Sequence, residues 1–155
     1  MIYKIIDKII LLAKTINFKK IKRVRKENIL INIASGIELW RSRTYNSKEP
    51  ETLDWIDNFK KKDVFFDIGA NIGLYSLYAA KKKCKVYAFE PASSNYSSLI
   101  KNIEINNLKI NSFGIGLSNE EKLTFINLVS TIQGDSQHNV NNKQKIYARN
   151  YKIKQ

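Results

Sequence analysis

The alternation of apolar and polar residues predicts a chain in which strands and helices follow one another. Short apolar runs bounded by charges, glycines or polar turns are typical of buried strands. Four such runs occur, at residues 64–68, 85–89, 110–115 and 123–128. Apolar positions at helical spacing predict one helix over residues 74–80 and another ending at 107. Strands that alternate with helices in this way indicate an α/β fold with a parallel sheet.

The N-terminal third has a different pattern. Apolar residues at helical spacing predict an amphipathic helix over residues 1–16, which could pack on its own domain, on a partner or on anionic lipid. The basic cluster at 19–26 is expected to be a solvated helix end or a linker. Residues 28–33 and 37–40 predict two strands of a hairpin around Ser35-Gly36. Pro50, with acids on both sides, marks the start of a further helix.

The most informative stretch runs from Asp67 to Gly73 and joins a predicted strand to a predicted helix. Gly69 allows a sharp turn, and Gly73 allows close packing of the helix. The glycines are spaced G-x-x-x-G, which disfavours the G-x-G-x-x-G turn of nicotinamide and flavin folds. A carboxylate at Asp67 would repel a pyrophosphate and suits a cationic ligand. S-adenosylmethionine has an ammonium, a sulfonium and a carboxylate in one short arm and fits this requirement.

A second acid follows the next predicted strand. Glu90 comes about twenty residues after the glycine turn, where an acid commonly accepts hydrogen bonds from ribose hydroxyls. Either acid alone could be a turn or strand-end residue. Together, with the glycines between them, Asp67 and Glu90 favour a nucleoside-containing cofactor.

Residues 63–108 resemble the core of the FkbM family of S-adenosylmethionine-dependent methyltransferases. The similarity lies in the D-I-G-A-N-I-G turn, in the A-F-E-P strand end, and in the helix with Leu99, Asn102 and Asn106. It implies a Rossmann-like three-layer sandwich and usually O-methylation of a small molecule, sugar or glycan. By this resemblance, Asp67, Gly69 and Asn71 would border the methionine end of the cofactor. The full candidate cofactor-binding set is Asp67, Gly69, Ala70, Asn71, Gly73, Glu90, Pro91 and Leu117, with Leu117 placed against the adenine.

Part of the family pattern is absent, because no D-V-E-G strand end follows residue 128. We therefore expect an incomplete sandwich that lacks the fourth and later strands, in a chain that is an N-terminal fragment. The expected divisions are an N-terminal helix and hairpin (1–48), half of a methyltransferase domain (49–130) and a poorly ordered basic tail (131–155). No catalytic residue can be assigned. The unpaired edge of the first sheet strand predicts a tendency to self-associate.

Composition narrows the function further. One cysteine and one histidine exclude a disulfide framework and a Cys/His zinc site, and no metal ligand set is predicted. No apolar run is long enough to span a membrane, which favours a cytoplasmic protein. The net charge is +13, and residues 1–27 contribute +7 of it, with nine basic residues against two acidic ones. Lysine, isoleucine and asparagine are abundant throughout the chain, as expected from an AT-rich genome, so part of the positive charge reflects codon usage. Nucleic acid is therefore an unlikely partner.

Three functional hypotheses follow from the sequence. The first is a methyltransferase that uses S-adenosylmethionine on a small-molecule or glycan acceptor. The second is an inactive remnant whose basic residues 1–27 bind anionic lipid at the membrane periphery or nucleic acid. The third, half of a nicotinamide-dependent dehydrogenase, is disfavoured by the glycine spacing and by Asp67.

Overall fold

A computed structural model describes residues 18–120, 126–128, 130–136 and 139–140 of the chain. Its centre is a parallel sheet of three strands, β3 (Val64–Ile68), β4 (Lys85–Phe89) and β5 (Ile110–Phe113), in the order β3-β4-β5. Helix α4 (Leu74–Lys81) connects β3 to β4, and α5 (Ser93–Asn106) connects β4 to β5. The predicted strands and helices of this part of the chain are thereby confirmed, although β5 ends two residues earlier than expected.

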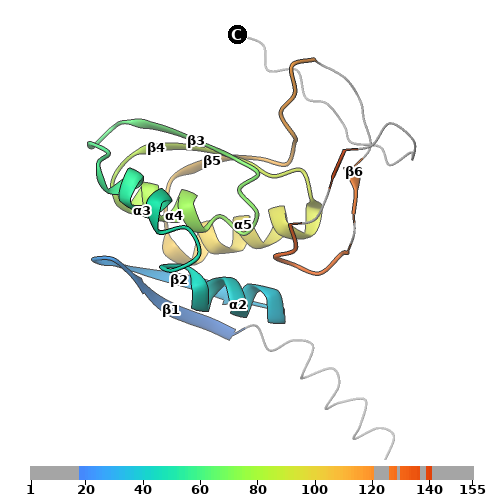
Figure 1. Cartoon of the computed structure of the whole chain (residues 1–155), viewed down its shortest axis with the longest axis horizontal. Coiled ribbons are helices and arrows are strands. Elements are labelled where there is room, and N and C mark those ends of the chain that lie inside the picture. The colour runs from blue at the N-terminus through green and yellow to red at the C-terminus, as the bar shows by residue number, and fades with distance from the viewer. Residues whose placement is uncertain (1–17, 121–125, 129, 137–138, 141–155) are drawn as a thin grey trace, which may run out of the picture.

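Figure 1 shows the sheet, then the helices α3, α4 and α5, and then a hairpin, stacked in that order. The two faces of the sheet differ. Side chains of Phe65 and Val86 point toward the helices and are buried. On the opposite face, Val64, Phe66 and Ile68 are 54%, 57% and 66% exposed. The incomplete Rossmann-like fold expected from the sequence is confirmed, with both helices of the parallel unit on the same face.

The hairpin lies earlier in the chain than predicted. Strands β1 (Phe18–Val24) and β2 (Glu27–Ile33) pair antiparallel, and the turn between them includes Arg25 at a φ of 52°. The basic cluster at 19–26 is therefore a strand and its turn, and the prediction of a helix end or linker is wrong. Lys20 and Lys22 are only partly exposed and lie opposite Ile31 and Ile29, so that their aliphatic stems cover the sheet.

Residues 37–40, predicted as the second hairpin strand, belong instead to helix α2 (Gly36–Thr44). Ser35 is its N-cap: the Glu38 amide donates to Ser35 Oγ at 3.0 Å, and the Ser35 amide donates to Glu38 Oε2 at 3.0 Å. This reciprocal pair is a capping box, which satisfies backbone donors that a helix start leaves unpaired. The alternation of Ile37 and Leu39 indicated a strand, but the cap determines the local structure.

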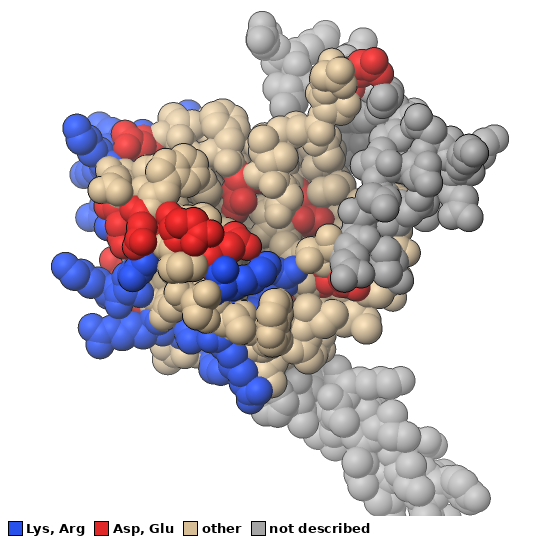
Figure 2. Space-filling model, in the orientation of Figure 1, with Lys and Arg blue, Asp and Glu red and all other residues tan. Residues whose placement is uncertain are grey.

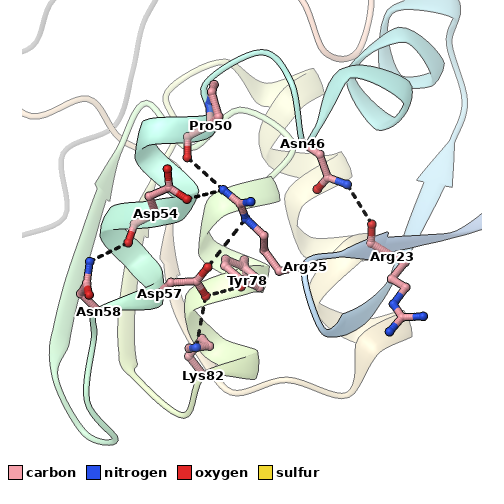
Figure 3. A network of polar contacts seen from close by, with 9 residues as sticks. All are labelled: Arg23, Arg25, Asn46, Pro50, Asp54, Asp57, Asn58, Tyr78 and Lys82. Carbon is pink, nitrogen blue, oxygen red and sulfur yellow. Dashed lines mark hydrogen bonds and ion pairs between the residues drawn. The ribbon is translucent and has the colours of Figure 1, made fainter.

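Arg25 joins the hairpin turn to helix α3 (Pro50–Asp57), as Figure 3 shows. Its guanidinium pairs with Asp54 and lies 3.7 Å from Asp57 Oδ2. Asp57 also accepts hydrogen bonds from the Tyr78 hydroxyl at 2.5 Å and from Lys82 at 3.2 Å. Burial alone would raise the pKa of Asp57, but these two hydrogen bonds and the nearby cations lower it below its usual value. The network connects the β1–β2 turn to α3 and α4.

The charges of the described surface are separated. Figure 2 shows basic side chains gathered over the hairpin and a band of acidic side chains beside them, over α3. The acidic residues of α3 are Glu51, Asp54 and Asp57. No helix of the described segments is long and apolar enough to cross a membrane. In the view of Figure 2 the hairpin presents a basic surface, although other basic residues of the described chain lie outside it, among them the lysines at 60–62 and 81–83.

The two asparagines of the α5 motif contact the free edge of β2. Asn102 Oδ1 accepts from the Asn32 amide at 2.8 Å, and Asn102 Nδ2 donates to Ile72 O at 2.8 Å. One helical turn later, Asn106 accepts from the Leu30 amide at 2.8 Å and donates to Leu30 O at 2.7 Å. Two side-chain amides thus replace a neighbouring strand. Hairpin, helices and β4 share one apolar core, which includes Val24, Ile29, Ile31, Leu53, Leu77 and Val86.

Replacing Asn106 with alanine should lower the free energy of unfolding by about 1–2 kcal/mol, because both backbone groups of Leu30 lose their partner. Urea denaturation followed by circular dichroism measures this change. The neighbouring Asn107 is the matched control: it is exposed at a φ of 50°, a conformation that glycine adopts readily. Asn107→Gly should leave stability almost unchanged, and an equal loss in both variants would contradict the edge-pairing role.

Four further expectations concern the start of α5 and the two ends of the chain. Helix α5 begins after Ala92 without a side-chain cap, so the predicted cap by Ser93 or Ser94 is wrong. The strand expected at 123–128 is represented by β6 (Ile126–Asn127), which pairs with β7 (Asn139–Val140). The amphipathic helix predicted over 1–16 lies outside the described residues. Residues 131–136, which fall in the tail expected to be poorly ordered, form a turn that packs against the rest of the molecule.

Candidate functional site

The glycine turn follows β3 and is held against the end of β4. The amides of Gly69 and Ala70 both donate to Phe89 O, at 2.9 and 3.0 Å. Gly69 has a φ of +79°, and Asn71 has a φ of 52°. These left-handed conformations turn the chain sharply from the strand into α4, so that the turn lies at the carboxyl edge of the sheet, where α/β folds bind ligands.

The two glycines have different environments. A Cβ added at Gly73 would lie 2.3 Å from Leu99 Cδ1, so this glycine is needed for contact between the start of α4 and helix α5. A Cβ added at Gly69 would meet nothing within 4 Å. Gly69 is therefore needed for its left-handed backbone conformation and not for close packing, and the space beside the turn stays open to a ligand.

Glu90 connects the end of β4 to the glycine turn. Its side chain is 5% exposed; Oε2 accepts from the Asn71 amide at 2.7 Å, and Oε1 accepts from the Ala92 amide at 2.8 Å. Two backbone donors therefore fix the orientation of this carboxylate. Each carboxylate oxygen can accept more than one hydrogen bond, so this arrangement is compatible with additional ribose donors.

Asp67 lies on the helix-facing side of β3 and accepts a hydrogen bond from Ser76 Oγ at 2.6 Å. Burial raises the pKa of Asp67 above its usual value, and the charge of Glu49 acts in the same direction, whereas the hydrogen bonds from Ser76 act against it. Asp67 in turn helps to raise the pKa of Tyr45 and Tyr75. The glycine turn thus has an acid on each side, Asp67 before it and Glu90 beside it.

We expect Asp67→Asn to increase the free energy of unfolding at pH 7. Because the pKa of Asp67 is higher in the folded state, folding favours its protonated form, and stability falls as the pH rises through that range. Asparagine removes the buried charge and still accepts a hydrogen bond from Ser76. Below the unfolded pKa of about 4, aspartate is protonated in both states, so the advantage should disappear. Urea denaturation at pH 7 and pH 3.5 tests this; a difference independent of pH would contradict it.

A cavity of about 270 Å³ lies between the glycine turn and the segment from α2 to α3. Three predicted residues line it, namely Gly69, Ala70 and Asn71; Asp67, Gly73, Glu90, Pro91 and Leu117 do not. The opposite side was not predicted from the sequence, because it comes from residues 41–49, which were expected to belong to the N-terminal helix-and-hairpin segment and to the start of the next helix. Its lining residues are Arg41, Thr44, Tyr45, Lys48 and Glu49, joined by Tyr75 of α4 and Ser136.

Pro91 and Leu117 lie near the same edge of the sheet but away from this cavity. A Cβ added at Gly116 would lie 3.7 Å from Pro91 Cβ, so the turn after β5 contacts the turn after β4. Leu117 is 48% exposed. The contact of Leu117 with an adenine ring stays a prediction, as do the ligand contacts of the other candidate residues.

Residues 132–136 form a turn that contacts the site. The side-chain amides of Asn71 and Asn95 both donate to Asp135 O at 2.8 Å, and the Gly134 amide donates to Asn95 Oδ1 at 2.7 Å. Arg41 Nε donates to Gly134 O. This turn is therefore fixed by the glycine loop, by α5 and by α2, through contacts that sequence spacing does not reveal.

Comparison with known proteins shows similarity to methyltransferases. A tRNA (guanine(37)-N(1))-methyltransferase of Dictyostelium discoideum is 34% identical over 107 residues, which is 63% of this chain and 22% of that protein. Methyltransferase sdnD of Sordaria araneosa is 32% identical over 59% of this chain and 37% of its own length. The chain thus spans well under half of either relative. A putative transferase of Pyrococcus horikoshii aligns with a TM-score of 0.45 at 19% identity, over 65% of this chain and 37% of that one.

The family model of the methyltransferase FkbM domain matches residues 67–154, more than half of the chain. The match begins at Asp67 and includes the glycine turn, Glu90 and the asparagine helix. The chain therefore belongs to the FkbM methyltransferase domain family, which confirms its sequence-based assignment to the methyltransferases that use S-adenosylmethionine.

Proposed function

We propose that this chain provides the cofactor-binding half of an O-methyltransferase that acts on a hydroxyl group of a small molecule, sugar or glycan. One observation supports this more than any other: Glu90 is held by the Asn71 amide, so an oriented carboxylate lies directly beside a glycine turn. The open space at Gly69 and the acid at Asp67 fit a cationic nucleoside rather than a pyrophosphate.

The cofactor, when bound, supplies an electrophilic methyl group. Methyl transfer to an oxygen requires the acceptor and the methyl group to be aligned and water to be excluded, so positioning accounts for most of the rate. In this proposal Glu90 holds the ribose, Asp67 and the glycine turn face the methionine end, and Leu117 contacts the adenine. The base for the acceptor hydroxyl is not assigned. His138, the chain's single histidine, lies outside the described residues.

The exposed outer face of the sheet supports the proposal that this chain is a fragment. Val64, Phe66 and Ile68 lie on that face, and the aromatic rings of Phe66, Tyr87, Phe89 and Phe113 stack across it. Complete three-layer folds cover both faces of a parallel sheet. Self-association through this face or through the β3 edge, a cytoplasmic location and membrane contact through residues 1–27 remain proposals.

Calorimetry with S-adenosylhomocysteine tests cofactor binding, and transfer of a labelled methyl group to a panel of sugars and other hydroxyl acceptors tests the reaction. We expect binding by the chain as it exists. Transfer should become measurable when the coding frame is extended by the rest of a family domain. Absence of binding in both the chain and the extended protein would contradict the proposal.

An RNA acceptor is the second candidate. Two observations favour it: a relative at 34% identity is named as a tRNA methyltransferase, and six basic residues fall within positions 19–26, on the hairpin. This modifies the sequence-based expectation that nucleic acid is an unlikely partner. Binding of a tRNA pool should then weaken steeply with salt and should be lost in Lys19→Glu combined with Arg23→Glu. Anionic vesicles tested in parallel distinguish the alternative of a lipid-binding remnant.

A further inference from the structure

Two oppositely charged side chains, Arg41 and Glu49, line the cavity from the segment between α2 and α3. Arg41 extends from α2, and its Nε donates to Gly134 O. Within the described part of the chain, no carboxylate forms an ion pair with its guanidinium. Glu49 is the residue before α3, and its carboxylate lies 3.3 Å from Nζ of Lys48, which also lines the cavity. A half-buried cation and a carboxylate thus line one small volume.

The size of the cavity limits what it can hold. Its volume of about 270 Å³ is below the range of roughly 300–1,000 Å³ that is typical of sites for complete small molecules. A short polar group fits, whereas an entire nucleoside cofactor does not. Because Gly69, Ala70 and Asn71 line the other side, a group in this cavity would adjoin a ligand bound along the glycine turn.

We propose that the cavity binds the amino-acid end of the cofactor, with Arg41 contacting the α-carboxylate and Glu49 contacting the α-ammonium. The inference rests on the proposed function and goes beyond it, because both residues precede the segment that matches the family domain. A zwitterion matches the cavity in charge: its carboxylate would pair with Arg41, which has no ion-pair partner in the described part of the chain, and its ammonium would lie beside Glu49, which it would share with Lys48. Arginine also suits a carboxylate because its planar guanidinium can donate two parallel hydrogen bonds to the two oxygens.

Burial lowers the pKa of the Arg41 guanidinium, although the charges of Glu49, Asp135, Tyr75 and Glu90 act in the opposite direction. The desolvation of this cation is therefore not fully compensated by its surroundings. A bound carboxylate would compensate it. The same charge pattern could also recognise a free amino acid, so the experiment must distinguish an amino acid from the amino-acid end of a nucleoside.

Calorimetry with two ligands tests the inference. S-adenosylhomocysteine contains the amino-acid end, whereas 5′-methylthioadenosine has the same nucleoside and thioether without it. We expect Arg41→Met to weaken binding of S-adenosylhomocysteine by about tenfold, the equivalent of one charge-assisted contact, and to leave binding of 5′-methylthioadenosine unchanged. Glu49→Gln should show the same selectivity. Arg43→Met is the matched control, because Arg43 is exposed on the same helix and outside the cavity.

The outcomes separate this inference from the proposed function. If neither the unmodified chain nor the extended protein binds either ligand, the proposed function fails. If either protein binds both and Arg41→Met weakens them equally, or weakens neither, the cavity assignment fails. Binding of free methionine as tightly as S-adenosylhomocysteine would also overturn it, in favour of an amino-acid site. Arg41→Lys should restore part of the lost affinity, and thermal melting confirms that each variant is folded.

Discussion

Gly73→Ala is expected to lower the free energy of unfolding by about 2–5 kcal/mol. The residue has a φ of +85°, a conformation that costs a residue with a Cβ about 1–2 kcal/mol. The new Cβ would also lie 2.3 Å from Leu99 Cδ1, and Leu99 is completely buried, so it cannot move away without displacing its neighbours. Overpacking of this kind typically costs a further 1–3 kcal/mol. Urea denaturation measures the sum.

Two comparisons separate strain from overpacking. Gly36→Ala is the matched control, because its Cβ would meet nothing within 4 Å and its φ is not positive; we expect almost no change. Gly69→Ala should show the conformational cost alone, since its Cβ also has open space. Combining Gly73→Ala with Leu99→Ala should cost less than the sum of the single changes. Equal stability of the Gly73 and Gly36 variants would contradict the close contact.

Glu90→Gln should weaken binding of S-adenosylhomocysteine by about a hundredfold, equivalent to two charge-assisted hydrogen bonds to the ribose. Glutamine has one acceptor oxygen, so its amide group would face the N–H of either Asn71 or Ala92. The glycine turn would then lose one of its connections to β4. Both effects reduce affinity, and calorimetry measures the change.

Glu104→Gln provides the control for Glu90→Gln. Glu104 is exposed on α5, and its substitution removes the same charge. Its affinity should equal that of the unmodified chain. Since Glu90 also has a structural role, melting temperatures must accompany the binding data. A folded Glu90→Gln variant with unchanged affinity would contradict the assignment of Glu90 to the ribose.

The parallel sheet was predictable because β3 and β4 are short, mainly apolar runs separated by a proline-free segment long enough to form a helix. The hairpin was misplaced for a physical reason. Ile37 and Leu39 alternate as in a strand, but the capping box of Ser35 and Glu38 stabilises a helix there. The S-x-x-E spacing was visible in the sequence and is the signal that could have corrected the prediction.

Half of the candidate site was predictable, since the glycine turn and Glu90 are local motifs. The other half depends on contacts between segments far apart in the chain. Arg41 and Glu49 lie in the segment that follows β2, and Asn102 helps to hold β2 against α5 while it also donates to Ile72 O beside the glycine turn. Nothing in the residues around Arg41 indicates this placement. The asparagines were recognised as part of a motif, but their function required the position of β2.

The asparagine contacts between β2 and α5 have a consequence for the order of assembly during synthesis. They join residues that are 70 and 76 positions apart. The hairpin itself is local and can form as soon as residue 33 has left the ribosome, whereas non-local contacts form later. Its full set of contacts with α5 must wait until Asn106 has emerged. During that interval Ile29 and Ile31 lack their final neighbours, so a nascent chain is exposed to holding chaperones until the second half of α5 is complete.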